Sequence, residues 1–115
     1  MNNPYRGEIW RVQLNPIVGA ETGKKRPAVI LSNDVSNRYA QTVTILPVTD
    51  PGERIFPFKV PLPAKTPGLT RESKVRCQQI RSVDKSRLLD RLGKVDSHKL
   101  REIEAALLVH LSIEQ

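Results

Sequence analysis

Arg26 and Thr49 are the two residues of this sequence whose types and positions best suit phosphate chemistry. Arg26 precedes Pro27, and a residue before proline is pushed into extended geometry, so its backbone is held at the start of an apolar strand. Thr49 closes a later strand-like run, TILPVT. If these strands are neighbours, a guanidinium and a hydroxyl converge beside the loop NPIVGAETGK and can stabilise charge that develops on phosphorus. By spacing alone, a simpler interpretation is favoured, in which Arg26 caps loop carbonyls and Thr49 closes a turn.

Other kinds of reactive centre are poorly represented. The two histidines, His98 and His110, lie twelve residues apart, and the chain has one cysteine, so no zinc site can be built from this spacing. We therefore expect no metal and no cofactor. The glycines of the first loop lack the Gly-Lys-Ser/Thr that completes a phosphate-binding loop. Cys77 lies near cations that can lower a thiol pKa, but it alternates in phase with Val75, which is typical of a small buried residue.

The composition favours a polyanionic partner. The chain of 115 residues carries 19 Lys and Arg against 12 Asp and Glu, a formal net charge of +7, and we expect one domain spanning residues 1–115. Such a charge suits binding to polyanions, although it also serves solubility alone. No apolar run has the length of a membrane span, the N-terminus lacks a secretory apolar core, and one cysteine cannot form an internal disulfide. These features predict a cytoplasmic protein with no membrane partner.

The positive charge is concentrated in the middle of the chain. Ten of the nineteen cations, with only four acids, lie between Arg71 and Arg101, whereas the residues from Glu102 onward include three Glu and no cation. Aromatic residues make up 4% of the chain, too few for a sheet that stacks bases. Any contact with nucleic acid therefore rests on phosphates and hydrogen bonds.

Short strands dominate the hydrophobic pattern. Strands are predicted at 7–14, 27–32, 41–49, 55–62 and 73–83, with a further short one at 92–95. In the first, Trp10, Val12 and Leu14 share one face. The second is apolar at consecutive positions, as in a strand that is buried on both faces. Pro57 and Pro61 restrict the fourth to an edge of the sheet.

Two helices are also predicted. The first is short and spans 83–92, with Asp84 as its N-cap. The second begins at Asp96 or Ser97. Its apolar stripe repeats at spacings of three and four, at Leu100, Ile103, Leu107 and Leu111. Such a stripe packs on a core. Several short strands and a terminal helix together predict a mainly β fold, a small, strongly bent sheet or partly open barrel with a helix packed on it.

The opening pattern, NPxxGxE followed by an arginine-proline and an apolar strand, is fairly specific. The segment RGEIWRVQLNPIVGAETGKKRPAVILSND resembles the opening of the MazF/PemK-like toxins, bacterial endoribonucleases of toxin–antitoxin pairs. The resemblance continues through TILPVT and SKVRCQQIRSVDKSRLLDRLGKV to LREIEAALLVHL, and so covers nearly the whole chain. It implies an SH3-like β-barrel with a terminal helix, usually dimeric, and it implies that Arg26 and Thr49 are the catalytic pair.

The resemblance also implies a reaction and the residues that serve it. The RNA's own 2′-hydroxyl attacks the adjacent phosphorus, which leaves a 2′,3′-cyclic phosphate and a 5′-hydroxyl and needs no metal. Glu21 matches a glutamate of some relatives, and it either accepts the 2′ proton or orients the loop. Gln79 and Arg81 match a segment that lines the RNA groove in relatives, although strand residues there can instead bond a neighbour. The further expected RNA contacts are Asn15, Lys24 and Lys25.

The implied partners are single-stranded RNA as substrate, an acidic and partly disordered antitoxin, and a second copy of the chain in a homodimer. Two other functions stay open. Toxins of this fold also include proteins that bind DNA gyrase and cut nothing, and a passive basic RNA-binding domain needs neither residue of the pair. The presence of Arg26 together with Thr49 favours the nuclease.

Overall fold

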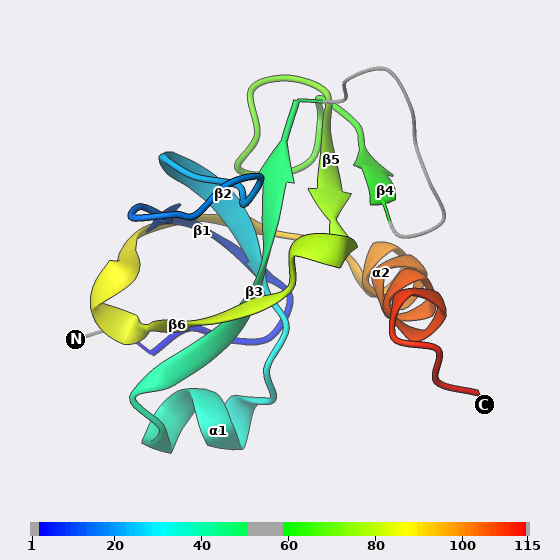
Figure 1. Ribbon diagram of the computed structural model, residues 1–115. Helices are drawn as coiled ribbons and strands as arrows, with labels where there is room; N and C mark the ends of the chain where they lie inside the picture. Colours follow the sequence, from blue (N-terminus) through cyan, green and yellow to red (C-terminus); the bar gives the residue numbers. More distant parts are fainter. Residues whose placement is uncertain (1–2, 51–58, 115) are drawn as a thin grey trace.

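Short antiparallel strands make up most of the fold in the computed structural model, which describes residues 3–50 and 59–114 (Figure 1). Within these ranges the elements are β1 (Glu8–Gln13), β2 (Lys25–Ile30), α1 (Asp34–Tyr39), β3 (Thr42–Thr49), β4 (Lys59–Leu62), β5 (Ser73–Arg76), η1 (Cys77–Gln79), β6 (Arg81–Asp84), η2 (Lys85–Arg87), β7 (Leu88–Lys94) and α2 (Ser97–His110). The described strands form one seven-stranded sheet in the order β4-β5-β3-β2-β1-β7, with β6 paired to β3 beside this path. The predicted mainly β fold with a C-terminal helix is confirmed.

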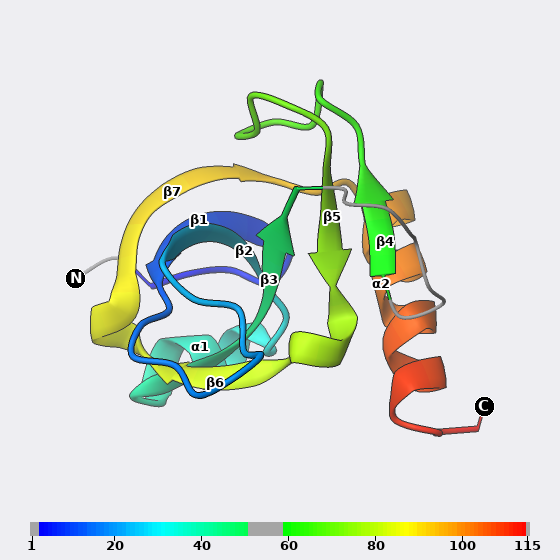
Figure 2. The same cartoon turned by 45° about the horizontal axis from the view of Figure 1, so that its top comes forward.

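Strand β3 bends the sheet because its two halves have different partners. Residues 42–45 pair with β6, and the last two residues pair with β5. Ile45 of β3 lies opposite Arg81 of β6, and Val48 of β3 lies opposite Val75 of β5. An advance of three residues along β3 therefore corresponds to six residues between Val75 and Arg81. The three surplus residues form the 3-10 turn η1, so the single strand predicted at 73–83 is correct at its ends and wrong in its middle. Figure 2 shows the resulting ring of β7, β1, β2, β3 and β6 beside β5, β4 and α2.

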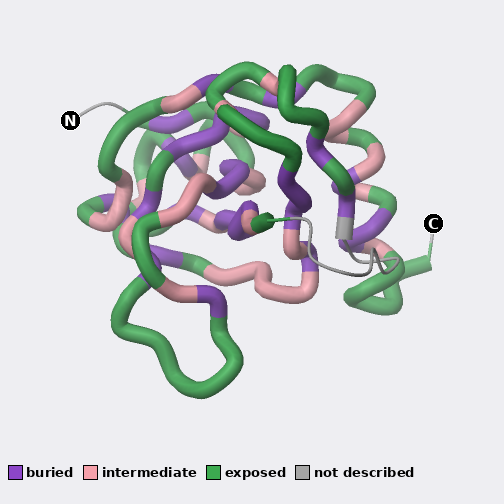
Figure 3. Tube along the Cα trace, turned by 90° about the horizontal axis from the view of Figure 1, so that it is seen from above, coloured by how far each residue is buried: buried purple, intermediate pink, exposed green. Residues whose placement is uncertain are grey.

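The alternation of β1 separates two clusters of buried residues. Trp10, Val12 and Leu14 belong to one cluster, as the predicted face requires, and Ile9 belongs to the other. β2 contributes Ile30 to the first cluster and Val29 to the second, so it is buried on both faces, as its continuous apolar run predicts. Figure 3 shows the buried positions on the inner strands and on the side of α2 that meets the sheet.

The C-terminal helix α2 begins where the sequence predicts. The carboxylate of Asp96 accepts a hydrogen bond from the Lys99 N–H at 2.7 Å and caps the first turn. Ile103 and Leu107 are buried in a core cluster, but Leu111 of the predicted stripe is 47% exposed because it follows the last helical residue. Among the described helices, none has the length and apolar character to cross a membrane.

The helix predicted at 83–92 is wrong. This segment contains the end of β6, the turn η2 and most of β7, and the strand predicted at 92–95 is the end of β7. Asp84 does act as a cap, but its carboxylate accepts the Ser86 N–H of the three-residue turn η2 at 2.8 Å. The extended chain that follows is held by antiparallel pairing with β1. A partner from the other end of the chain overrides the local helical pattern.

The hydrophobic pattern does not predict the short helix α1. Asn33 caps it by accepting the Ser36 N–H at 2.8 Å. Its buried residue is a polar one, Asn37, so the helix has no apolar stripe that periodicity can detect.

β4 lies at an edge of the sheet, as the two prolines predict. Val60 and Leu62, which belong to the predicted apolar face, are buried. Phe56, Phe58 and Pro57 of the same predicted strand lie outside the described residues.

Candidate active site

The structure brings Arg26 and Thr49 to one cavity. β2 and β3 are neighbours, with Ala28 opposite Pro47. Continuing this antiparallel register by two residues places Arg26 opposite Thr49, where the two strands end. Both residues are half-buried and line a cavity of about 240 Å³, called here the Arg26 cavity. Arg26 and Thr49, from adjacent strands, therefore line the same small space.

Arg26 is fixed in position while most of its donors stay available. Its backbone pairs with Val12 of β1, and its Nε donates to the carbonyl of Gly23 at 3.3 Å. A guanidinium has five N–H donors, so this contact leaves the four terminal ones for a ligand. No carboxylate in residues 3–50 or 59–114 forms an ion pair with it.

The hydroxyl of Thr49 is also weakly engaged. It donates to the carbonyl of Asp50 at 3.4 Å, near the long limit of a hydrogen bond. These contacts are the ones that the simpler interpretation requires, in which Arg26 caps a loop carbonyl and Thr49 closes a turn. They use only part of each side chain, so they leave both groups able to bind a phosphate.

One wall of the Arg26 cavity is formed by residues 68–71, and this part of the chain docks on β7 through two glycines. Gly68 has a φ of +91°, and a Cβ on it would lie 2.6 Å from the carbonyl carbon and oxygen of Leu92. A Cβ on Gly93 would clash with the Pro67 carbonyl. The two backbones therefore touch where no side chain fits, and this contact holds Arg71 beside the cavity.

Among the described residues, two arginines besides Arg26 line the cavity, and each pairs with a carboxylate. A nitrogen of Arg11 lies 3.5 Å from Asp90, and one of Arg71 lies 2.7 Å from Asp50. Neither arginine is indicated as a site residue by the sequence pattern. The alternation of β1 gives the face of Arg11, but nothing local indicates that the segment of Arg71 docks on β7.

Thr22 ties the first loop, residues 14–24, to the turn η1. Its buried hydroxyl accepts a hydrogen bond from Arg76 Nη1 at 2.9 Å, and its N–H donates to Gln79 Oε1 at 3.1 Å. Gln79 lies in η1 and not in a strand. Its observed contact is the alternative one, a bond to a neighbouring segment, and its contact with RNA stays a prediction.

Arginines of β6 and η2 hold the start of the same loop. Arg81 Nη1 donates to the carbonyl of Leu14 at 3.2 Å, and Arg87 Nη1 donates to the carbonyl of Asn15. Asn15 Oδ1 in turn accepts the Lys24 N–H at 3.0 Å, which closes the neck of the loop. Arg81 and Asn15 therefore shape the loop, and their contacts with RNA stay predictions.

Glu21 does not line the Arg26 cavity. Its carboxylate accepts the Val18 N–H at 2.6 Å within the exposed loop, which is the loop-orienting role. Lys24 and Lys25 are exposed immediately before Arg26. Lys24 has a φ of +70°, a left-handed conformation that costs an L-residue about 1 kcal/mol.

Cys77 is a buried core residue, as its phase with Val75 predicts. Burial raises the pKa of its thiol to about 12, so the thiol stays protonated and unreactive near neutral pH. Within the described part of the chain, no group of His, Cys, Asp and Glu is arranged to hold a metal ion.

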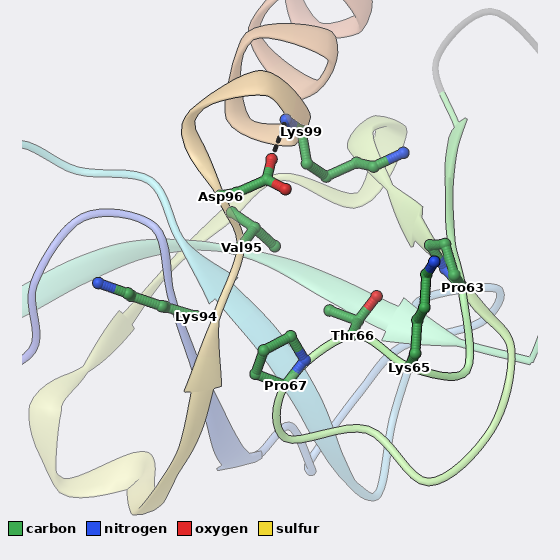
Figure 4. A pocket seen from close by; sticks show the side chains of 8 residues that line it. All are labelled: Pro63, Lys65, Thr66, Pro67, Lys94, Val95, Asp96 and Lys99. Carbon is green, nitrogen blue, oxygen red and sulfur yellow. Dashed lines mark hydrogen bonds between the residues drawn. The ribbon is translucent and has the colours of Figure 1, made fainter.

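A separate cavity of about 350 Å³ lies where α2 begins (Figure 4). Lys65, Lys94 and Lys99 lie around it, and Asp96 caps the helix there. These lysines are point charges on flexible stems and lack the fixed fork of an arginine. The Arg26 cavity is therefore the better candidate for phosphate chemistry.

Comparison with known proteins gives the family. The family described as PemK-like, MazF-like toxin of type II toxin-antitoxin system matches residues 5–111. Endoribonuclease MazF9 of Mycobacterium tuberculosis is 41% identical over 113 residues, which cover 94% of this chain and 96% of that protein. MazF from Deinococcus radiodurans, a crystal structure, is similar with a TM-score of 0.86 at 29% identity, covering 98% of this chain and 100% of that one. An endoribonuclease in complex with its cognate antitoxin from a mycobacterial species has a TM-score of 0.80 at 27% identity, covering 97% and 98%. This chain belongs to the PemK-like, MazF-like toxins of type II toxin–antitoxin systems.

Proposed function

We propose that this chain is a sequence-specific, metal-independent endoribonuclease that cuts single-stranded RNA at the Arg26 cavity. The family and the relatives named as endoribonucleases make it an endoribonuclease toxin. The observation that supports the site is the meeting of Arg26 and Thr49, from adjacent strands, at one cavity of about 240 Å³.

The proposed first step uses a nucleophile that the substrate carries. The 2′-hydroxyl attacks the adjacent phosphorus in line, the bond from phosphorus to the 5′-oxygen breaks, and the products are a 2′,3′-cyclic phosphate and a 5′-hydroxyl. Neither a metal ion nor an external water is needed for this step. The protein's task is to hold the phosphate and to stabilise the charge that develops on it.

Arg26 and Thr49 divide this task. Arg26 presents terminal N–H groups that bind two phosphate oxygens and stays charged at any working pH. Thr49 donates its hydroxyl to a non-bridging oxygen. Because Arg26 Nε is already bonded to Gly23, the guanidinium needs little reorganisation when substrate arrives. Glu21 is the candidate acceptor of the 2′ proton, and its observed bond to Val18 favours the loop-orienting role.

The antitoxin is proposed to be an acidic, partly disordered protein that folds over the basic site. The support is the net charge of +7 and a similar structure described as an endoribonuclease in complex with its cognate antitoxin. We expect the affinity between toxin and antitoxin to fall as salt rises, because part of the attraction is long-range. An affinity that is equal at low and high salt would instead indicate a chiefly apolar contact.

We further propose that the chain works in the cytoplasm as a homodimer.

Purified protein with excess EDTA tests the reaction. It should cut single-stranded RNA at a few sequence contexts and leave 5′-hydroxyl ends. Arg26→Ala should lower the rate on the order of 10²-fold or more, as losing one preorganised charge-stabilising donor does, and Arg26→Lys should restore it only partly. Thr49→Ala should lower the rate with the fold intact. Arg101→Ala, which removes an exposed cation of α2 outside the cavity, is the matched control and should cut normally.

A substrate with one 2′-deoxy sugar directly 5′ of the cut separates this mechanism from others. It should bind and stay uncut, because the nucleophile is gone while the phosphates and bases remain. Cleavage of that bond would refute the mechanism. Failure to cut any RNA, together with stalled gyrase, would support the gyrase-binding function instead.

A further inference from the structure

The three arginines of the Arg26 cavity have different partners. Arg26 donates to a backbone carbonyl, whereas Arg11 pairs with Asp90 and Arg71 pairs with Asp50. Among the described residues, the Arg26 side chain is bonded only to a neutral group, so its guanidinium keeps its full charge for a ligand. A guanidinium beside a carboxylate is neutralised until that carboxylate is displaced.

Both ion pairs are exposed enough to be displaced. The side chains of Arg11 and Asp90 are 50% and 54% exposed, and those of Arg71 and Asp50 are 71% and 58% exposed. Exposed pairs of this kind contribute little net free energy because water competes for both partners. A phosphodiester, which accepts two parallel N–H bonds from one guanidinium, can therefore replace the aspartate.

Arg11 and Arg71 line the same cavity as Arg26 and Thr49. Arg71 lies two residues before β5, Thr49 ends β3, Arg26 lies in β2 and Arg11 lies in β1. The neighbours in the sheet are β5-β3-β2-β1, so the four residues come from adjacent strands or from the segment that leads into β5. At about 4.8 Å per strand, these four strands span about 14 Å from β5 to β1. A single-stranded backbone with its scissile phosphate at Arg26 thus has its neighbouring phosphates within reach of the other two arginines that line the cavity.

The size of the cavity agrees with this arrangement. At about 240 Å³ it is smaller than the roughly 300–1,000 Å³ of pockets that enclose a drug-sized ligand. It accommodates one small part of a polymer, and the rest of the polymer must lie over the surrounding surface, where Arg11 and Arg71 are exposed.

We propose that Arg11 and Arg71 bind the phosphates that flank the scissile one, and that Asp90 and Asp50 are their exchangeable counter-ions in the free protein. The choice of RNA as ligand rests on the proposed function. The aspartates keep the two arginines oriented when RNA is absent, and they lower the affinity for weaker anions because every anion must first displace them.

Binding of a labelled 2′-O-methyl RNA oligonucleotide to the full-length protein tests this without any cleavage. Arg11→Gln and Arg71→Gln should each weaken binding about tenfold at low salt, as loss of a charge-assisted hydrogen bond does. Each should also reduce the slope of log affinity against log salt by about 0.7, the value for one phosphate contact on a single strand. Arg101→Gln removes the same charge outside the cavity and should leave the slope unchanged.

Substitution of the two aspartates should change the affinity for RNA in the opposite direction. Asp50→Asn and Asp90→Asn should each strengthen binding roughly twofold to fivefold, because the exposed ion pair no longer competes. The gain from Asp50→Asn should vanish in the double variant with Arg71→Gln, since the freed guanidinium is then missing. In cleavage assays Arg11→Gln and Arg71→Gln should raise KM and leave kcat within about twofold, unlike Arg26→Ala.

Several outcomes would overturn the proposal. Unchanged salt slopes in both arginine variants would do so, even if the protein cuts RNA. Weaker binding of an acidic antitoxin peptide with unchanged RNA binding would assign the two arginines to the protein partner instead. Reduced slopes in a protein that cuts no RNA would keep the proposal and reject the nuclease function, so the two hypotheses fail separately.

Discussion

The guanidinium of Arg76 donates a 2.9 Å hydrogen bond to the hydroxyl of Thr22, which lies 54 residues away along the chain. Thr22 is 6% exposed, and the residue after it, Gly23, accepts the Nε bond of Arg26. The pair therefore links the end of β5 to the orientation of the Arg26 guanidinium through one peptide unit.

Thr22→Val should lower kcat by about tenfold with little change in KM, because valine keeps the shape and removes the acceptor, and a small displacement of a catalytic group is costly. It should also cost roughly 1–3 kcal/mol of unfolding free energy, since a part-buried Arg76 N–H loses its partner. The Nε of Arg76 already has no hydrogen-bond partner among the described residues. Thr22→Ser, which keeps the hydroxyl, should retain activity. Cleavage rates measure kcat and thermal melts measure stability. A kcat equal to that of the parent protein in Thr22→Val would show that the bond does not position Arg26.

Glu21→Gln separates the two roles of that glutamate. Glutamine keeps an oxygen that can accept the Val18 N–H bond, so the loop-orienting role predicts activity within about threefold of the parent. A general base cannot be replaced by an amide, and loss of one typically costs 10²-fold or more. We expect the small effect. A large loss of kcat together with disappearance of the acid limb of the pH–rate profile would assign Glu21 as the base.

Glu8 should make stability depend on pH in the acid range. Burial by itself raises the pKa of Glu8, but hydrogen bonds from Trp10, Tyr5 and Arg91 outweigh it and hold the pKa below its ordinary value of 4.5. Because the folded pKa is the lower one, this contribution to stability is full above about pH 4.5 and is lost as pH falls through the folded value. The melting temperature should therefore decline below about pH 4.5.

Glu8→Gln should reduce stability by roughly 1–3 kcal/mol at neutral pH and should flatten the decline in acid, because the ionisable partner is gone. Glu72→Gln, an exposed substitution of the same kind, is the matched control. Thermal melts of the three proteins between about pH 3 and about pH 7 measure both effects. Parallel curves for Glu8→Gln and the parent would contradict the prediction.

The end of α2 should form part of a homodimer interface. Val109, Leu111 and Ile113 are 60%, 47% and 51% exposed, a run of apolar surface that a second copy can cover. Light scattering at micromolar concentration should give twice the monomer mass of 13.0 kDa. Val109→Glu should yield monomers, and Val35→Glu, at an exposed valine of α1, should not. Monomers in the parent protein would exclude the dimer, and dissociation only by Val35→Glu would move the interface to α1.

The sequence by itself determines the features of this protein that depend on neighbours along the chain. The alternation of Trp10, Val12 and Leu14, the cap at Asp96 and the extended geometry of Arg26 before proline all arise within a few residues, where periodicity and backbone sterics act. The arginine-proline pattern with the threonine at a strand end is local in the same sense. This is why the candidate pair could be named before its geometry was known.

Only the tertiary structure decides which distant segments meet. The chain at 83–92 carries helical signals and is nevertheless a turn and a strand, because β1 offers it a ladder of backbone hydrogen bonds. Arg71 reaches the Arg26 cavity through the backbone contact between Gly68 and Gly93, and Thr22 is held by Arg76 from a different strand. Such contacts join groups far apart in sequence, and their free energy depends on the whole fold, so no short window of residues encodes them.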